Sequence, residues 1–172
     1  MKLAECSESC KPAILEIFND AIANTTALYD YRPRTLQMMD AWFETKRAGR
    51  FPIIGAFDEM GALLGFGTYG TFRSFPAYKY TVEHSVYVQG AARGKGIGKA
   101  LLQEIILKAK EQDLHVLVGA IDASNLASIA LHEKAGFTFS GKISQAGFKF
   151  GRWLELSFYQ LILSTPSEPM DG

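Results

Sequence analysis

The fold is decided by the stretch Val86-Tyr-Val-Gln-Gly-Ala-Ala-Arg-Gly-Lys-Gly-Ile-Gly-Lys-Ala-Leu-Leu102, which passes from a β-like run through a glycine-rich turn into an amphipathic helix. Backbone N–H groups at the start of a helix attract anions, and glycines let a ligand approach the backbone closely. Three cations, Arg93, Lys95 and Lys99, flank the turn. The stretch therefore predicts an anion site between a strand and a helix.

Length and composition fit one globular domain. The chain has 172 residues, 48% of them hydrophobic, and its 18 basic residues balance 18 acidic ones. This balance favours no nucleic-acid partner, and no apolar run is long enough to span a bilayer. The N-terminus lacks the apolar core of a signal peptide, so a cytoplasmic location is expected. Cys6 and Cys10 are not spaced as C-x-x-C and lie far in sequence from the three histidines, so neither a metal site nor a redox pair is expected.

Hydrophobic periodicity predicts interleaved helices and strands. The expected helices are 12–23, 35–47, 96–112 and 125–135, with Ser7 or Ser9 capping the first. The expected strands are 2–4, 51–57, 63–69, 80–88, 115–121, 137–143 and 154–163, the last two joined by an aromatic turn around 148–153. Because hairpin-like strands follow one another in the middle of the chain, we expect a mixed α/β sheet with helices on both faces. One domain should span residues 1–163, and 164–172 should form a flexible polar tail.

Two common phosphate loops do not fit the glycine turn. A Walker loop needs four residues between its first glycine and its Gly-Lys pair, followed by Ser or Thr. The segment Gly94–Ala100 is one residue short and places Ala100 where the hydroxyl should be. A dinucleotide fingerprint needs G-x-G-x-x-G, whereas this turn reads G-x-G-x-G. A glycine-rich turn without any ligand explains the local composition equally well.

A third kind of loop fits. Arg93-Gly-Lys-Gly-Ile-Gly98 matches R-x-x-G-x-G, and here the sequence resembles the GNAT superfamily of acetyl-CoA-dependent N-acetyltransferases. A second block, Asn125-Leu-Ala-Ser-Ile-Ala-Leu-His-Glu-Lys-Ala-Gly-Phe137, is similar to the later helix of that family. The resemblance covers nearly the whole chain. It implies the GNAT fold, a twisted and mostly antiparallel central sheet of about six to seven strands with helices on both faces.

The resemblance implies an acetyl-CoA site without a metal. In the family, N–H groups of the loop bind the CoA pyrophosphate, and the preceding strand pairs with pantetheine and donates to the oxyanion. The Asn and Ser of the later helix line the pantetheine arm. The corresponding residues here are Val86, Tyr87, Val88, Arg93, Gly94, Lys95, Gly96, Ile97, Gly98, Lys99, Asn125 and Ser128. An N-cap and a glycine stop would explain Asn125 and Gly136 without a ligand.

Three segments are similar to the phosphinothricin-type acetyltransferases within this superfamily. They are 77–88, Leu131-His132-Glu133, and Gln145-Ala-Gly-Phe-Lys-Phe-Gly-Arg-Trp153. Members acetylate the amino group of small amino-acid analogues, including phosphinothricin, methionine sulfoximine and methionine sulfone, and are typically homodimers. The resemblance therefore implies a small amino-acid-like amine as acceptor and a homodimeric enzyme.

Two residues are candidates for proton transfer. An ammonium ion has no lone pair, so a base must first remove a proton, and Glu83 is the candidate. Without the resemblance, Glu83 is more simply a solvated glutamate on a strand face. His84 should point to the opposite face, so that both could serve one site only through a bulge. His132 takes the place of a tyrosine that protonates the leaving thiolate in many members; it is either this acid or a second base.

The residues that bind the acceptor are less well defined. Arg73 either forks onto an anionic group of the acceptor or is a solvated loop arginine. The further candidates for substrate binding are Ser74, Phe75, Glu83, His84, Ser85 and Lys149. Tyr29, Tyr31 and Tyr78 fit either this pocket or a dimer interface. Acetylation of a protein N-terminus or an aminoglycoside, and a non-catalytic acetyl-CoA sensor, are the alternative functions.

Overall fold

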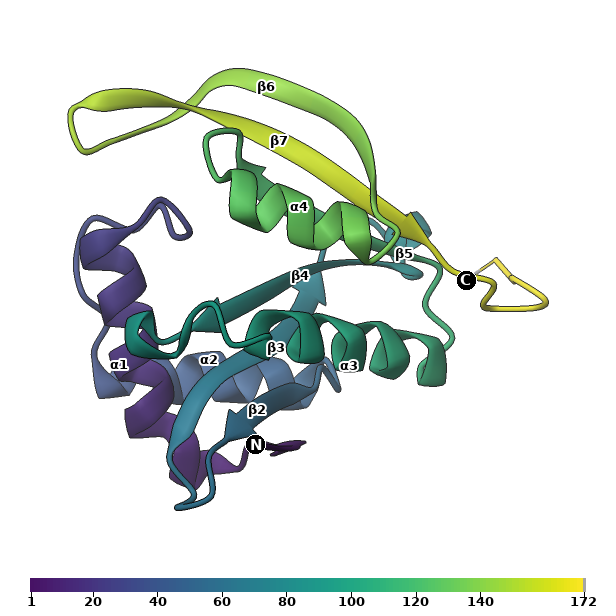
Figure 1. Cartoon of the computed structure of the whole chain (residues 1–172). Helices are drawn as coiled ribbons and strands as arrows, with labels where there is room; N and C mark the ends of the chain where they lie inside the picture. Colours follow the sequence, from purple (N-terminus) through teal and green to yellow (C-terminus); the bar gives the residue numbers. More distant parts are fainter. Residues whose placement is uncertain (172) are drawn as a thin grey trace.

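The computed structural model describes residues 1–171 and contains a seven-stranded sheet in the order β1-β2-β3-β4-β5-β7-β6 (Figure 1). The strands are β1 (Lys2–Glu5), β2 (Ile53–Phe57), β3 (Leu63–Thr71), β4 (Thr81–Val88), β5 (Val116–Asp122), β6 (Thr138–Lys149) and β7 (Arg152–Ile162). The helices are α1 (Lys11–Asn24), α2 (Leu36–Ala48), α3 (Ile97–Glu111) and α4 (Leu126–Lys134). Every neighbouring pair of strands is antiparallel except β4 and β5. The expected mixed, mostly antiparallel sheet is confirmed.

Helices cover both faces of the sheet (Figure 1). On one face, α1 and α2 bury an apolar cluster whose members include Ile14, Phe18, Met39, Phe43 and Phe66. On the other face, α3 contributes Ile97, Leu101, Leu102, Ile105 and Ala109, and residues of α4 pack at the edge of the same cluster. The recurrence of these α3 residues at every third or fourth position is what makes the helix amphipathic and places the glycine turn at its start.

The two central strands, β4 and β5, diverge. They pair only where Thr81–Glu83 lies against Val116–Val118. Beyond that point β4 stays paired to β3 as far as Val88, and β5 stays paired to β7 as far as Asp122. Because each strand is held by its outer neighbour, the sheet opens in its centre between the carboxyl ends of β4 and β5.

The start of α1 differs from the expectation that Ser7 or Ser9 caps it. A 3-10 turn, η1 (Glu8–Cys10), precedes the helix, and Cys10 is the N-cap without a side-chain hydrogen bond. The hydroxyls of Ser7 and Ser9 bond one another at 2.7 Å instead. The expected serine cap is therefore wrong, because the extra turn carries both serines away from the first N–H groups of the helix.

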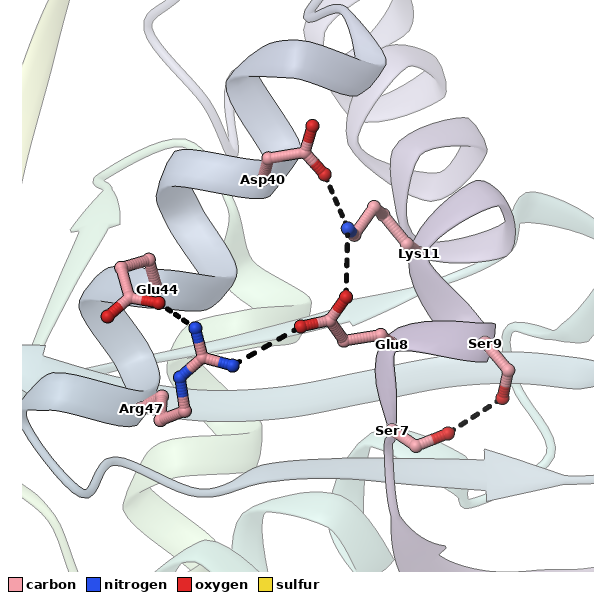
Figure 2. A network of polar contacts seen from close by, with 7 residues as sticks. All are labelled: Ser7, Glu8, Ser9, Lys11, Asp40, Glu44 and Arg47. Carbon is pink, nitrogen blue, oxygen red and sulfur yellow. Dashed lines mark hydrogen bonds and ion pairs between the residues drawn. The ribbon is translucent and has the colours of Figure 1, made fainter.

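An ion-pair network fixes this turn against α2 (Figure 2). The two carboxylate oxygens of Glu8 accept from Lys11 at 3.3 Å and from Arg47 at 3.4 Å. Lys11 also bonds Asp40, and Arg47 bonds Glu44. Exposed ion pairs contribute little individually, but this network connects η1, α1 and α2 through one carboxylate.

The last two strands form a hairpin much longer than predicted. Phe150 and Gly151 make its two-residue turn, with φ of 51° and 72° as a type I′ turn requires. The sequence predicted that the first of these strands ends at Ile143. In the structure the pairing register shifts between Ile143 and Gly147, and this irregularity interrupts the alternation of side chains on which the prediction depended. The hairpin extends well past α4 (Figure 1).

The segment that follows β7 returns to the body of the domain. The ring nitrogen Nδ1 of His115 lies 2.7 Å from the carbonyl oxygen of Thr165, and Met170 N–H donates to the Tyr80 hydroxyl at 3.2 Å. Gly172, the last residue of the expected tail, lies outside the described residues. Within residues 1–171, no helix combines the length and the apolar character that crossing a membrane requires.

Candidate active site

A cavity of about 820 Å³ lies where β4 and β5 diverge. It brings together most of the residues expected to bind cofactor and acceptor: Glu83, His84, Ser85, Val86, Tyr87, Val88, Arg93, Gly94, Gly96, Ile97, Gly98, Lys99, Asn125, Ser128 and His132. Five expected residues lie outside its lining: Arg73, Ser74, Phe75, Lys95 and Lys149. Among residues 1–171, no three His, Cys, Asp or Glu side chains gather as metal ligands would.

The glycine turn offers an open backbone at the start of α3. Gly94 and Gly96 have φ of +76° and +79°, and a Cβ at either position would have no heavy atom within 4 Å. Gly96 is the N-cap of α3, so the unpaired N–H groups of the first helical turn follow it directly. Arg93 Nε donates to the Val88 carbonyl at 3.2 Å and ties the turn to β4. Open glycines, a helix N-terminus and nearby cations fit the pyrophosphate of CoA.

Asn125 has the capping role that needs no ligand, and it also lines the cavity. Its Oδ1 accepts from the Ser128 N–H at 3.1 Å and so begins α4. Ser128 lies one turn before His132 on the same helix. The cap thus places both residues along the cavity wall opposite β4.

Glu83 and His84 lie on opposite faces of the sheet, as alternation predicts. The pairing of β4 with β3 is unbroken from Thr71↔Val82 to Gly65↔Val88, so β4 contains no bulge. Both residues nevertheless line the cavity. The expectation that only a bulge could bring both to one site is therefore wrong: the opening between β4 and β5 exposes both faces of β4 to the same space.

The environment of Glu83 suits a proton acceptor. Burial raises the pKa of Glu83 above that of an ordinary glutamate, and the positive charge of Arg73 opposes part of this rise. Arg73 itself is exposed, stacks on Phe72 with its guanidinium carbon 4.6 Å from the ring centroid, and donates to the Phe72 carbonyl at 3.0 Å. Arg73 therefore acts on Glu83 through its charge.

His84 and His132 form a buried pair that sequence reasoning missed. Their Nε2 atoms are 2.9 Å apart, and His132 Nδ1 lies 2.7 Å from the carbonyl oxygen of Ser128. Burial lowers the pKa of both histidines, and the charge of His132 lowers that of His84 further. A Cβ at Gly119 on β5 would lie 3.0 Å from His84 and 3.3 Å from His132, so this glycine leaves room for both rings. A glycine inside a buried strand was the available sequence signal.

Asp122 is a second residue that the sequence did not single out. It ends β5, and with Glu83 it supplies the acidic side chains of the cavity lining. Burial pushes the pKa of Asp122 upward, but hydrogen bonds from Thr26 and Ser124 and the charge of Arg152 outweigh burial, so its pKa lies below the ordinary value. Arg152 Nη2 is 3.4 Å from its carboxylate. Asp122 is thus a weaker proton acceptor than Glu83.

Lys149 has a structural position rather than the substrate contact expected from the sequence. Its ammonium donates to the carbonyls of Thr25 at 2.9 Å and Leu28 at 2.6 Å. Both residues belong to the loop that joins α1 to α2, and residues 25–29 of this loop line the cavity. The expectation that Lys149 contacts the acceptor is therefore wrong, because its ammonium group is already hydrogen-bonded to two carbonyls of the loop.

Two neighbours of Lys149 hold the same loop. Gly147 leaves room for the ring of Tyr29, since a Cβ at that glycine would lie 2.7 Å from the ring. The Tyr31 hydroxyl donates to the Phe148 carbonyl at 2.6 Å. The β6–β7 hairpin therefore positions one wall of the cavity, which explains why its Gly-Phe-Lys sequence lies so far along the chain from the other site residues.

Replacing Lys149 by methionine should loosen this wall. Two carbonyls would lose their donor, so we expect the free energy of unfolding to fall by about 1–3 kcal/mol. We also expect the KM for the acceptor to rise about 10-fold, because the wall is no longer held in place. Thermal unfolding and steady-state kinetics measure both effects. Lys142→Met is the matched control, since Lys142 is an exposed lysine of the same strand that bonds Glu155; an equal rise in KM there would contradict the assignment.

Comparison with known proteins adds independent information. Residues 13–137 match the model of the acetyltransferase (GNAT) family. The chain is 50% identical over 159 residues to an L-methionine sulfoximine/L-methionine sulfone acetyltransferase of Pseudomonas aeruginosa, covering 92% of each chain. A ribosomal-protein-alanine N-acetyltransferase structure from Brucella melitensis is 43% identical, with TM-score 0.92 and coverage of 95% and 100%. A phosphinothricin acetyltransferase from Sinorhizobium meliloti in complex with acetyl-CoA is 34% identical, with TM-score 0.95 and coverage of 99% and 94%.

Proposed function

Because the chain belongs to the GNAT family of acetyltransferases, we propose that it acetylates the amino group of a small amino-acid analogue of the methionine sulfoximine, methionine sulfone or phosphinothricin type. The observation that carries the proposal is the cavity at the opening of the sheet, whose lining includes the glycine turn, Glu83 and His132. The names of the similar enzymes support the acceptor class.

The glycine turn and Val86–Val88, together with Asn125 and Ser128, would hold acetyl-CoA, which supplies the acetyl group as an activated thioester. The edge of β4 that faces the opening offers backbone N–H groups as donors. Glu83 accepts a proton from the ammonium of the acceptor, and its raised pKa makes it a better match to an amine than an ordinary glutamate. His132 gives a proton to the leaving thiolate or takes one from the amine at Nε2, because its Nδ1 is committed to the Ser128 carbonyl. The contact between this Nε2 and Nε2 of His84 must open for that step. Transfer is direct, with both substrates bound together.

A panel of amines tests the proposal. Release of free thiol from acetyl-CoA would be measured with methionine sulfone, methionine sulfoximine, phosphinothricin, plain amino acids, an aminoglycoside and a peptide with N-terminal alanine. We expect the three analogues to give the highest kcat/KM. Preference for the peptide or the aminoglycoside would support acetylation of a protein N-terminus or of that drug instead. Binding of acetyl-CoA in calorimetry without thiol release on any amine would support a non-catalytic sensor.

The charge of Arg73 predicts a specific pH effect. Glu83 must be deprotonated to act as a base, and Arg73 holds its pKa down. Removing that charge in Arg73→Gln should raise the pKa of Glu83 and move the acidic limb of the kcat/KM profile to higher pH. The profile would be recorded for the acceptor at saturating acetyl-CoA. Lys79→Gln removes a cation from the same exposed region and should leave the limb in place; identical limbs in wild type and Arg73→Gln would reject the coupling.

We also propose that the protein is a homodimer. Large apolar side chains are exposed on the β6–β7 hairpin, and they support the homodimer that the resemblance implies. They are Phe139, Ile143, Phe148, Phe150, Trp153 and Ile162. Light scattering should give twice the mass of one chain, whereas the mass of a single chain at assay concentrations would argue against a dimer. A cytoplasmic location remains a prediction.

A further inference from the structure

The hydrogen positions in the histidine pair follow from its geometry. A carbonyl oxygen only accepts, so His132 Nδ1, which lies 2.7 Å from the Ser128 oxygen, carries a hydrogen. In neutral His132, Nε2 then has a lone pair. The facing Nε2 of His84, 2.9 Å away, must therefore donate and carry a hydrogen of its own. This assignment leaves Nδ1 of His84 without a hydrogen.

Nδ1 of His84 is the unusual atom of the pair. It is buried and, among residues 1–171, has no hydrogen-bond partner. His84 as a whole is only 5% exposed, so water does not readily replace the missing partner. Burial and the charge of His132 lower the pKa of His84, and the backbone of Val118 on β5 opposes part of this fall. Among residues 1–171, Nδ1 of His84 is therefore a buried nitrogen without a partner, whether or not it carries a hydrogen.

One added proton changes the number of ring hydrogens in the pair. The neutral pair has two ring hydrogens, one on His132 Nδ1 and one between the two Nε2 atoms. The cationic pair has three, because His84 Nδ1 then carries a hydrogen as well. The charge can lie on either ring, since the hydrogen between the Nε2 atoms can belong to either. A second added proton would place two hydrogens between nitrogens 2.9 Å apart, and the pair excludes it.

Within residues 1–171, the groups packed against the two rings carry no charge. Phe137 lies 5.1 Å from both ring centroids, and Gly119 faces the rings from β5. Glu83, next to His84, projects from the other face of β4, and Asp122 lies at the far end of β5. On α4, Glu133 is 3.5 Å from the Tyr159 hydroxyl of β7. Burial is the largest influence on the pKa of both histidines; besides it, His132 and the Val118 backbone act on His84, and the Ser128 backbone acts on His132.

We propose that His84 is a positioning residue for His132, and that the two imidazoles, given space by Gly119, hold one proton as a single unit. The inference rests on the proposed function for its role in acetyl transfer, but the pair itself is a property of the protein without substrates. His84 orients the ring of His132 by donating to its Nε2 before the substrates react, and this hydrogen bond opens when Nε2 of His132 exchanges its proton.

Histidine-selective NMR of the wild-type protein without substrates tests the unit directly. We expect His132 in the Nδ1–H form and His84 in the Nε2–H form, with both rings following one titration curve as the pair takes up its first proton. Two unrelated curves, or His84 in the Nδ1–H form while the pair is neutral, would overturn the proposal. Because this measurement involves no acetyl transfer, it separates failure of the pair from failure of the proposed function.

Kinetics of His84 variants test the positioning. His84→Leu removes the donor, and we expect kcat to fall about 10- to 100-fold with the Kd for acetyl-CoA unchanged. His84→Gln retains an amide donor and should recover most of kcat. His115→Leu is the control, since His115 is exposed and bonds the carbonyl of Thr165. Equal kcat in His84→Leu and wild type, or equal loss in the Leu and Gln variants, would reject the positioning role.

Gly119→Ala provides a second variant that leaves both histidines in place. Its methyl group would lie 3.0 Å from His84 and 3.3 Å from His132, so one ring must move. We expect the shared titration curve to separate into two and kcat to fall, while circular dichroism remains that of the folded protein. If both histidines still followed one titration curve in folded Gly119→Ala, the space left by the glycine would not be needed for the two rings to share a proton.

Discussion

Replacing Glu83 by glutamine should lower kcat by about 10²–10⁴-fold, the range that general-base catalysis contributes. The amide has nearly the shape of the carboxylate but cannot accept the proton of the ammonium. The Kd for acetyl-CoA should not change, because Glu83 lies on the opposite face of β4 from His84 and apart from the glycine turn. The deficit should shrink as pH rises, since the acceptor then loses its proton to solvent. Steady-state kinetics against pH, with calorimetry for acetyl-CoA, measures these effects.

Asp122 gives this experiment its control. It is the other acidic side chain of the cavity lining, but its hydrogen bonds and Arg152 keep its pKa low. Asp122→Asn should therefore reduce kcat far less than Glu83→Gln does. If Glu83→Gln turned over like wild type while Asp122→Asn lost activity at every pH, Asp122 would be the base and Glu83 would have no part in proton transfer.

Local sequence signals predicted the glycine turn, α3 and the start of α4 well. The glycine turn, the four-residue recurrence along α3 and the Asn125 cap each depend on residues close together in the chain. Period and capping are backbone properties, so they can be recognised in the sequence without knowing what packs against them. In the structure, Gly94, Gly96, Asn125 and Ser128 all line the cavity.

The histidine pair and the contacts of Lys149 join distant segments, and the sequence did not predict them. Nothing near His84 indicates that β4 separates from β5 after Glu83, because this depends on how β3 and β7 hold the two strands. The same opening brings His132 onto His84. Lys149 illustrates the problem most clearly: its match to an acetyltransferase segment suggested contact with the acceptor, whereas its ammonium binds a loop more than a hundred residues earlier in the chain.

Replacing Gly96 by valine should weaken acetyl-CoA binding about 100-fold or more. Gly96 has φ of +79°, a conformation that a β-branched residue adopts only with strain, of order 1–3 kcal/mol. Its side chain would also occupy the space beside the first N–H groups of α3, where the fit to a pyrophosphate depends on close approach of the backbone. The change should appear in the Kd for acetyl-CoA by calorimetry and leave the acceptor side of the cavity intact.

Backbone strain and loss of the anion site can be separated, because the chain contains a matched glycine elsewhere. Gly61, in the turn between β2 and β3, has φ of +84°, and a Cβ there would also have no heavy atom within 4 Å. Gly61→Val should therefore cost similar stability in thermal unfolding, yet keep the wild-type Kd because it is not part of the cavity lining. If both variants bound acetyl-CoA as wild type does, the open backbone at Gly96 would not be the phosphate site. If both lost binding equally, strain alone would explain the effect; only loss confined to Gly96→Val assigns the anion to the start of α3.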